Sequence, residues 1–361
     1  MKRYYFNKLS STLQLYFQWK NSYLQLLISF IPALIVSATV NLSRISALMN
    51  LQIKRESRYR RLQNFFKNFE MDMEEYANFI MARLPKKGKF YLVMDRTNWK
   101  FGKKPINILM LGIIHKNMCF PLYWKNLDKG GSSNTSERKE LLDKAIKLIG
   151  GPRIIALLGD REFIGKYWFE YLKEQEIEFH IRLPKQFKIG SILKNNRKTV
   201  DSILNHWKEN VRIDYPRQVV IQGFNLYISG MKSKKGNCIV VSSKDNTNSL
   251  EKYQMRWTIE NLFFAFKTRG FNFEDTHMTA IEKIEKLLVL VSIAYSWSAL
   301  IGLWLTEEMK KMITIKNHGR KAKSVFRSGF DYLTKIFIKL LSGLIYNEYE
   351  FNQVTDVLSC T

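Results

Sequence analysis

The chain has 361 residues, which is long enough to bury a sizeable core and to form more than one domain. Its 58 lysines and arginines outnumber 32 acidic residues and give a formal net charge of +26. This excess favours a polyanionic partner, although a lysine-rich proteome would produce it as well. Cys119, Cys238 and Cys360 lie too far apart in sequence to form a disulfide framework or a cysteine zinc site from neighbouring pairs.

Residues 1–85 are predicted to be a helical region that binds DNA, with its clearer helices at 41–49 and 55–69. The second helix carries several arginines, with Tyr59 and two phenylalanines between them. This mixture suits contacts with a DNA backbone, but it also fits a solvated amphipathic helix. The apolar stretch 24–40 lies inside the chain and no small-residue cleavage pattern follows it, so we expect no secretory signal and a cytoplasmic protein.

The pattern changes at Lys89, where helical spacing gives way to short β-rich runs separated by turn residues. The first three runs predict a strand meander, and the alternation of helix and strand that follows predicts a βαβ arrangement. We therefore expect a mixed α/β domain formed by residues 86–183 and 246–280. The expected elements are strands at 90–94, 106–114 and 118–124, a helix at 136–149, a strand at 153–158, a helix at 163–175 and a strand at 177–183.

Residues 184–245 separate these two segments and are predicted to be a β-rich insertion, because short β-like runs alternate there with Gly, Pro, Asn and Lys. A long helical pattern begins after Asn246 and carries Glu260. The expected strands of the insertion are 218–222, 225–229 and 238–242.

Residues 281–361 are predicted to be a helical C-terminal region. Its segment 287–305 carries no charge and is long enough to cross a membrane. Serines and a tyrosine interrupt this segment, and mixed charges flank it on both sides. We therefore predict a buried helix and no membrane association, with a membrane protein as the alternative.

Three acidic residues are candidates for a catalytic metal site. Asp95 and Asp160 each follow a predicted strand, and Glu260 lies on the later helix. Phosphodiester chemistry requires an activated oxygen nucleophile and a stabilised leaving oxygen, which two hard cations held by carboxylates supply. Taken singly, none of the three indicates a site, because an Asp after a strand commonly caps a loop or helix and a Glu on a helix usually faces solvent.

A polar stripe distinguishes the helix around Glu260 from an ordinary surface helix. We expect this helix to be largely buried and its stripe to point into a site, because its other faces are mostly apolar. Glu260 would bind metal, while Arg256 and Lys267 bind phosphates near the scissile bond and Tyr253 donates to a phosphate oxygen. The alternative is an internal salt-bridge ladder, because Arg256 and Glu260 are four residues apart. The stripe consists of Tyr253, Arg256, Glu260 and Lys267.

These residues resemble the DDE transposases of bacterial insertion sequences, in particular the insertion sequence four group. The stripe lies within YQMRWTIENLFFAFKTRG and reproduces that group's Tyr-Arg-Glu-Lys signature with its full spacing. VMDRTNW around Asp95 and LLGDREF around Asp160 look like the group's two aspartate motifs. SRYRRLQNFF and KNHGRKAKSVFRSGFDYL extend the resemblance loosely over most of the chain.

The resemblance implies an RNase H-like catalytic fold with a β-rich insertion between the second aspartate and the glutamate. It implies that Asp95, Asp160 and Glu260 bind two Mg²⁺ ions, for which Mn²⁺ can substitute. The enzyme would cleave the terminal inverted repeats of a transposon and join the exposed 3′-hydroxyls to target DNA, in a homodimer or larger synaptic complex on the bacterial nucleoid. Some relatives form a hairpin intermediate and stack a flipped base on a tryptophan of the insertion, a role that Trp207 would take here.

Two other functions fit the same residues. A metal-dependent nuclease or resolvase would use the site for hydrolysis without strand transfer, because the same metals activate water and a 3′-hydroxyl. A DNA-binding relative without catalysis would act as a repressor or structural protein, although the presence of all three carboxylates argues against it.

Overall fold

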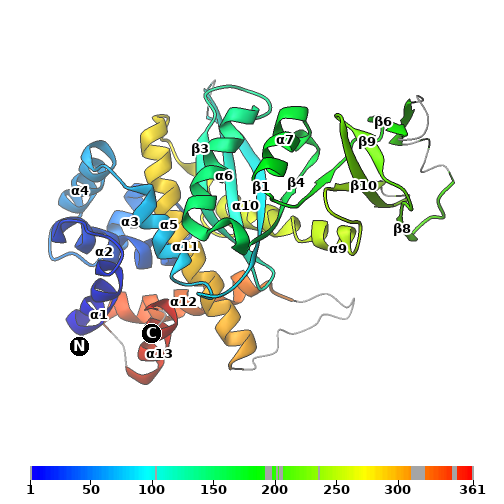
Figure 1. The fold of residues 1–361 in the computed structure, drawn as a ribbon. Coiled ribbons are helices and arrows are strands. Elements are labelled where there is room, and N and C mark those ends of the chain that lie inside the picture. The colour runs from blue at the N-terminus through cyan, green and yellow to red at the C-terminus, as the bar shows by residue number, and fades with distance from the viewer. Residues whose placement is uncertain are drawn as a thin grey trace. The chain divides into compact units, whose positions relative to one another are not determined.

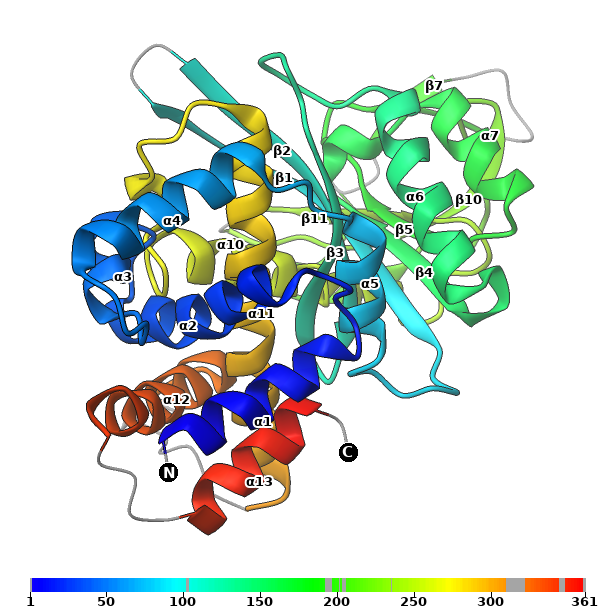
Figure 2. The same ribbon diagram turned by 90° about the vertical axis from the view of Figure 1, so that its left-hand side faces the viewer.

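The computed structural model describes residues 2–101, 104–191, 197–200, 202, 206–234, 236–309, 322–343 and 348–359. The chain divides into two compact units, which Figures 1 and 2 show as ribbons. We call the first the helical unit, formed by Met1–Lys86, Trp99–Pro105 and Leu262–Thr361. The second is the sheet unit, formed by Lys87–Asn98 and Ile106–Asn261. The helical unit therefore combines residues from both predicted helical regions.

A mixed β-sheet organises the sheet unit. The strand order is β3-β2-β1-β4-β5-β11-β10-β9-β6-β7, and β8 pairs with β10. The strands are β1 Phe90–Phe101, β2 Lys104–His115, β3 Met118–Asn126, β4 Ile154–Gly159, β5 Phe179–Arg182, β6 Lys188–Ser191, β7 Arg197–Thr199, β8 Arg212–Asp214, β9 Val219–Ile221, β10 Phe224–Met231 and β11 Cys238–Ser242.

The first five strands form the predicted meander followed by the predicted βαβ units. β2 pairs antiparallel with β3, whereas β4 pairs parallel with both β1 and β5. The parallel crossovers contain α6 (Thr135–Ile149) and α7 (Lys166–Glu174), which lie side by side in both views (Figures 1 and 2). α6 begins at a capping box, because the Asn134 side chain accepts from Glu137 N at 2.9 Å while the Glu137 carboxylate accepts from Asn134 N at 2.7 Å. The mixed α/β prediction is confirmed.

The parallel pairing of β1 and β4 brings the two candidate aspartates together. Met94 and Gly159 form the last pair in register, so the next residues, Asp95 and Asp160, lie beside each other where the pairing ends. The prediction that the first strand ends at Met94 is wrong, because β1 continues through Asp95 to Phe101. β1 remains a strand there through its other neighbour, β2.

The insertion is β-rich, as predicted, and its last strand joins the central sheet. β11 pairs antiparallel with β5, with Val240 opposite Arg182. β10 then pairs with β11 and carries the sheet outward. Strands from the predicted insertion therefore extend the central sheet through backbone hydrogen bonds.

The helix predicted around Glu260 consists of two helices, α9 (Ser249–Gln254) and α10 (Trp257–Lys267). At the break the backbone bonds span three residues, with Arg256 N donating to Tyr253 O at 2.9 Å and Thr258 N to Met255 O at 3.0 Å. The Thr258 hydroxyl also donates to the Met255 carbonyl at 2.7 Å, which favours this tight turn over a continuous helix. Trp257, the first residue of α10 and one of the apolar residues of the helix that we expect to be largely buried, is 58% exposed.

The helical unit has an apolar core around α11. This helix is long and apolar enough to cross a membrane, but 94% of its most apolar window is buried inside the protein, so the buried-helix prediction is confirmed. α12 crosses α11 closely, because a Cβ atom on Gly329 would lie 1.9 Å from the Ser298 carbonyl oxygen. The helices are α1 Lys2–Gln14, α2 Asn21–Ser37, α3 Leu42–Leu48, α4 Arg55–Asn68, α5 Met73–Met81, α11 Ile281–Glu307, α12 Val325–Ser342 and α13 Glu348–Ser359. The motif KNHGRKAKSVFRSGFDYL, which begins at Lys316, lies partly outside the described residues.

Candidate active site

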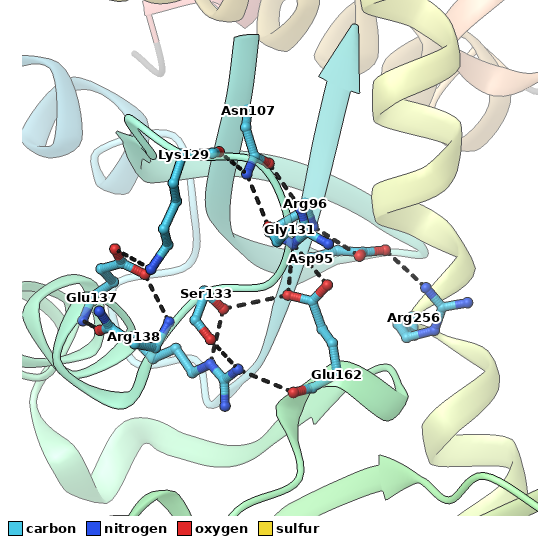
Figure 3. A network of polar contacts seen from close by, with 11 residues as sticks. Asp95, Arg96, Asn107, Lys129, Gly131, Ser133, Glu137, Arg138, Glu162 and Arg256 are labelled. Carbon is cyan, nitrogen blue, oxygen red and sulfur yellow. Dashed lines mark hydrogen bonds and ion pairs between the residues drawn. The ribbon is translucent and has the colours of Figure 1, made fainter. Parts of the chain in front are cut away.

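The candidate site forms where β1, the turn after β4 and the α9–α10 break meet within the sheet unit. Arg256 is its central residue. One guanidinium nitrogen, Nη1, donates to Asp95 Oδ2 at 2.9 Å, and the other, Nη2, donates to Glu260 Oε1 at 2.5 Å. Figure 3 shows the Arg256 guanidinium directed at Asp95. A single cation therefore holds two of the three predicted carboxylates.

Tyr253 connects this cation to the third carboxylate. The Arg256 Nε donates to the Tyr253 hydroxyl at 3.0 Å, and that hydroxyl faces Asp160 Oδ1 at 3.5 Å. Tyr253 is buried, and burial raises the pKa of its hydroxyl, so it stays protonated and can donate to a carboxylate. The structure thus joins Asp95, Asp160 and Glu260 through two polar side chains of the predicted stripe.

Arg256 makes the ion pair expected of a salt-bridge ladder and also the contact expected of a functional site. The contact expected of a salt-bridge ladder, Arg256 to Glu260, is present. The same guanidinium also reaches Asp95, which lies 161 residues away in sequence, and an isolated helix ladder would not do this. The stripe therefore points at the other two carboxylates, and its ladder contact is part of the site.

Charge and burial differ among the acidic groups. The Asp95 side chain is 17% exposed, and burial raises its pKa from 3.8 to about 6, although Arg256 and the backbone N–H of Arg96 oppose the shift. Burial acts to lower the pKa of Arg256, but Tyr253, Asp95 and Glu260 outweigh it and raise the pKa, so the guanidinium stays charged. The Glu260 side chain is 44% exposed, so it is the more accessible of the two carboxylates that Arg256 binds.

Lys267 lies two turns beyond Glu260 in α10 and belongs to the helical unit. Its ammonium pairs with Glu274 at 2.8 Å and lies 5.6 Å from the centre of the Trp99 ring. The structure therefore places five of the six stripe and aspartate-motif residues in the sheet unit's site through direct contacts, whereas Lys267 makes contacts of its own. Its predicted role in binding phosphate stays a prediction.

Trp207 lies in the insertion, as its predicted role requires, but its indole is buried. A Cβ atom on Gly230 would lie 2.8 Å from the Trp207 ring, so the ring packs directly on the β10 backbone. A flipped base could stack on the indole only after the side chain left this position. Base stacking by Trp207 stays a prediction.

A second polar network supports the two aspartates and was not predicted from the sequence. Arg96 follows Asp95, and its Nε lies 2.9 and 2.7 Å from the two carboxylate oxygens of Glu162. Arg96 Nη1 also donates to Asn107 Oδ1 at 2.9 Å on β2 (Figure 3). The only available signal was that each aspartate is followed by an arginine, in VMDRTNW and LLGDREF, and neither motif indicates which partner its arginine contacts.

The same network continues behind Glu162. Ser133 Oγ donates to Glu162 Oε1 at 3.3 Å, and the buried Arg138 donates from Nη2 to the Glu162 carbonyl at 3.0 Å (Figure 3). Arg138 Nε also donates to Ser133 Oγ at 2.9 Å. The turn that carries Asp160 is therefore tied to the loop before α6.

The profile of the family described as "Transposase DDE domain" matches residues 92–297. This match covers more than half of the chain and includes all three carboxylates and the arginine that joins two of them. The chain belongs to the transposase DDE domain family. As a member of this family it is a transposase-type protein that processes nucleic acid, and Arg256 lies within the matched residues.

Among solved structures, the transposase domain protein is similar to the chain in "Cryo-EM structure of piggyBac transposase synaptic complex with hairpin DNA (SNHP)". The two sequences are 11% identical, and the TM-score is 0.44. The similarity covers 92% of this chain and 76% of that chain. Comparison with curated proteins gave no match.

Proposed function

We propose that this protein is a transposase of the insertion sequence four group, which cleaves DNA at transposon ends and joins the new 3′-hydroxyls to target DNA. The observation that carries the proposal is the Arg256 guanidinium between Asp95 and Glu260, with Tyr253 linking it to Asp160. Residues that are far apart in sequence and are individually ordinary meet there in one polar cluster. With the exception of Lys267, they are the residues that form the Tyr-Arg-Glu-Lys and aspartate motifs.

The strand order supports an RNase H-like catalytic domain. An antiparallel meander, β1 to β3, is followed by β4 and β5 parallel to β1, in the order β3-β2-β1-β4-β5. The aspartates lie on β1 and directly after β4, where ligands of mixed α/β sheets collect. The β-rich insertion lies between Asp160 and Glu260, as proposed for this group.

The proposed cofactor is a pair of Mg²⁺ ions, for which Mn²⁺ can substitute. The donor chemistry fits, because Asp95, Asp160 and Glu260 offer the hard oxygen ligands that Mg²⁺ prefers. When bound, the ions would activate the attacking oxygen and stabilise the leaving oxygen. Among the described residues, however, no three His, Cys, Asp or Glu side chains are grouped closely enough to share a metal. Metal binding by all three carboxylates therefore requires them to come closer together, and we propose that Glu260 leaves Arg256 when this happens.

The proposed partners are the terminal inverted repeats of the element and target DNA, bound by a homodimer or larger synaptic complex. The net charge of +26 supports a DNA partner, because neutralising phosphates releases counterions. Released from Glu260, the Arg256 Nη2 would donate to a phosphate oxygen, and the Tyr253 hydroxyl would donate to another. We place this activity in the cytoplasm, on the nucleoid.

The deciding experiment incubates purified protein with a duplex that carries the ends of its own element and with a target plasmid. Mg²⁺, Mn²⁺ and EDTA are compared. Asp95→Asn, Asp160→Asn and Glu260→Gln should each abolish cleavage and retain DNA binding. Glu170→Gln, which changes an exposed carboxylate on α7, should cleave like the unchanged protein.

Each outcome separates the proposal from its alternatives. Cleavage followed by joining to the plasmid supports the transposase, whereas cleavage without joining supports a nuclease. DNA binding by the unchanged protein without cleavage in any metal supports an inactive relative. Full cleavage by any one of the three acidic variants removes that residue from the site.

A further inference from the structure

A basic pocket lies beside the candidate site in the sheet unit. Its volume is about 300 Å³, and its polar lining comes from Arg161, Arg182, Lys185, Gln186 and Asn237. Arg161 follows Asp160 after β4, and Arg182 ends β5. Because β4 and β5 are parallel neighbours, both arginines project from the same edge of the sheet as the candidate carboxylates.

Three cations share this pocket, and its lining contains no acidic side chain. Over the described part of the chain, no Asp or Glu lies within ion-pair distance of Arg161, Arg182 or Lys185. Arg182 makes one long hydrogen bond, from Nη2 to the Asn237 carbonyl at 3.3 Å. Like charges that converge without a counter-charge repel one another, and a bound anion would remove that repulsion.

Cys238 links the pocket electrostatically to the carboxylates. Burial raises the pKa of its thiol, while Arg182 and Arg256 act to lower it and Asp160 acts to raise it. Cys238 therefore lies within the field of a pocket arginine, of the central arginine and of the second aspartate at once. The pocket belongs to the same electrostatic neighbourhood as Asp160.

The donors in the pocket suit a phosphate. Guanidinium groups bind phosphate oxygens through paired N–H donors, and a lysine ammonium adds a point charge. Gln186 adds an amide that can donate a further hydrogen bond. Arg161 and Lys185 are exposed and Arg182 is half-buried, so all three can reach a phosphate that enters from solvent.

We propose that this pocket binds a phosphodiester group of the DNA strand that enters the site beside Asp160. The proposal rests on the proposed function and assigns Arg161, Arg182 and Lys185 to a phosphate subsite. Since Arg161 is adjacent to Asp160 in sequence, the bound phosphate lies close to the reacting phosphate and fixes the position of the strand. The three residues act in binding and positioning.

The test measures equilibrium binding of a fluorescent duplex in EDTA, so that no cleavage is needed. Arg161→Gln, Arg182→Gln and Lys185→Gln should each weaken binding about tenfold at moderate salt, because each removes a charge-assisted contact. Each should also reduce the slope of log affinity against log salt concentration by about 0.9. Arg161→Lys keeps the charge and should retain the slope.

Lys147→Gln is the matched control, because it removes an exposed lysine from α6 in the same unit. Thermal unfolding of every variant is measured alongside, and binding losses count only for variants that melt like the unchanged protein. If Lys185→Gln and the two arginine variants show the same slope and affinity as Lys147→Gln, the subsite does not exist. Arg161→Lys leaves the net charge of the protein unchanged. The test therefore stays decisive through this variant if a glutamine variant is unstable.

The outcomes also separate this subsite from the proposed reaction. Slope losses in a protein that never cleaves DNA support the subsite and remove the transposase activity. Normal cleavage with unchanged slopes removes the subsite and keeps the activity. A protein that binds no DNA overturns both. If inorganic phosphate raises the melting temperature of the unchanged protein but not of the triple glutamine variant, while DNA binding is equal in both, the pocket binds free phosphate and the DNA proposal fails.

Discussion

Arg96 and Glu162 join the two aspartate motifs directly, with Arg96 Nε 2.9 and 2.7 Å from the carboxylate oxygens of Glu162. Both side chains are only 16% exposed. Arg96 follows Asp95 on β1, and Glu162 lies in the turn that begins with Asp160. The pair therefore fixes the two aspartate-bearing segments relative to each other, in addition to the register of β1 and β4.

Replacing Arg96 should loosen the site. Arg96→Met leaves the largely buried Glu162 without its cation and should lower the free energy of unfolding by about 2–3 kcal/mol. Cleavage should fall at least about tenfold, because a small displacement of positioned groups is costly in catalysis. Arg96→Lys should restore part of the stability through Glu162 but not the contact with Asn107. Urea unfolding and single-turnover cleavage measure both effects, and wild-type values in Arg96→Met would show that the pair has no positioning role.

Removing Arg256 should make the protein less stable but more responsive to metal. Arg256→Met leaves Asp95 and Glu260 without their shared cation, which should cost about 3 kcal/mol of stability in EDTA. Mg²⁺ would then replace the lost charge, so the melting temperature of the variant should rise more with Mg²⁺ than that of the unchanged protein. Cleavage should still be lost, because no guanidinium remains to hold phosphate. An equal response to Mg²⁺ in both proteins would contradict competition between Arg256 and metal.

The raised pKa of Asp95 predicts a specific dependence of stability on pH. The folded-state pKa is about 6 and the ordinary value is 3.8, so the folded protein binds this proton more tightly than the unfolded chain does. The resulting stability is fully present below about pH 4 and is lost as the pH rises through 6. The loss should not exceed about 3 kcal/mol.

This dependence can be isolated by comparing variants. Asp95→Asn should show a flatter profile of unfolding free energy between pH 4 and 7 in EDTA than the unchanged protein. Asp128→Asn removes an exposed carboxylate and should retain the original slope. Identical profiles for Asp95→Asn and the unchanged protein would show that Asp95 titrates normally.

The close crossing of α11 and α12 should be intolerant of a single methyl group. A Cβ atom at Gly329 would lie 1.9 Å from Ser298 O and 2.4 Å from Gly302 N, so Gly329→Ala forces the helices apart. We expect a loss of about 1–3 kcal/mol or more. Gly130→Ala, where nothing lies within 4 Å of the added atom, should be nearly neutral. Circular dichroism melting distinguishes them, and an unchanged melting temperature for Gly329→Ala would refute the close contact.

The sequence by itself determined the mixed α/β fold class of the protein and most of its helices and strands. Alternating and helical spacing predicted the meander, α6, β4, α7 and β5, because each of these elements buries a face that its own residues specify. The same spacing predicted a buried α11. The motif residues around Asp95, Asp160 and Glu260 were identified because their chemistry is carried by residue type and local separation.

The tertiary structure alone decided how those residues meet. The pairing of β11 with β5, the break before Trp257 and the contacts of Arg96 with Glu162 and of Arg256 with Asp95 all join segments whose separation no local pattern records. The break is a particular case, because the apolar spacing of α9 and α10 continues across a turn fixed by three-residue hydrogen bonds. Local periodicity indicates which face of an element is buried. Strand register and the length of the side chains decide which charged groups come into contact.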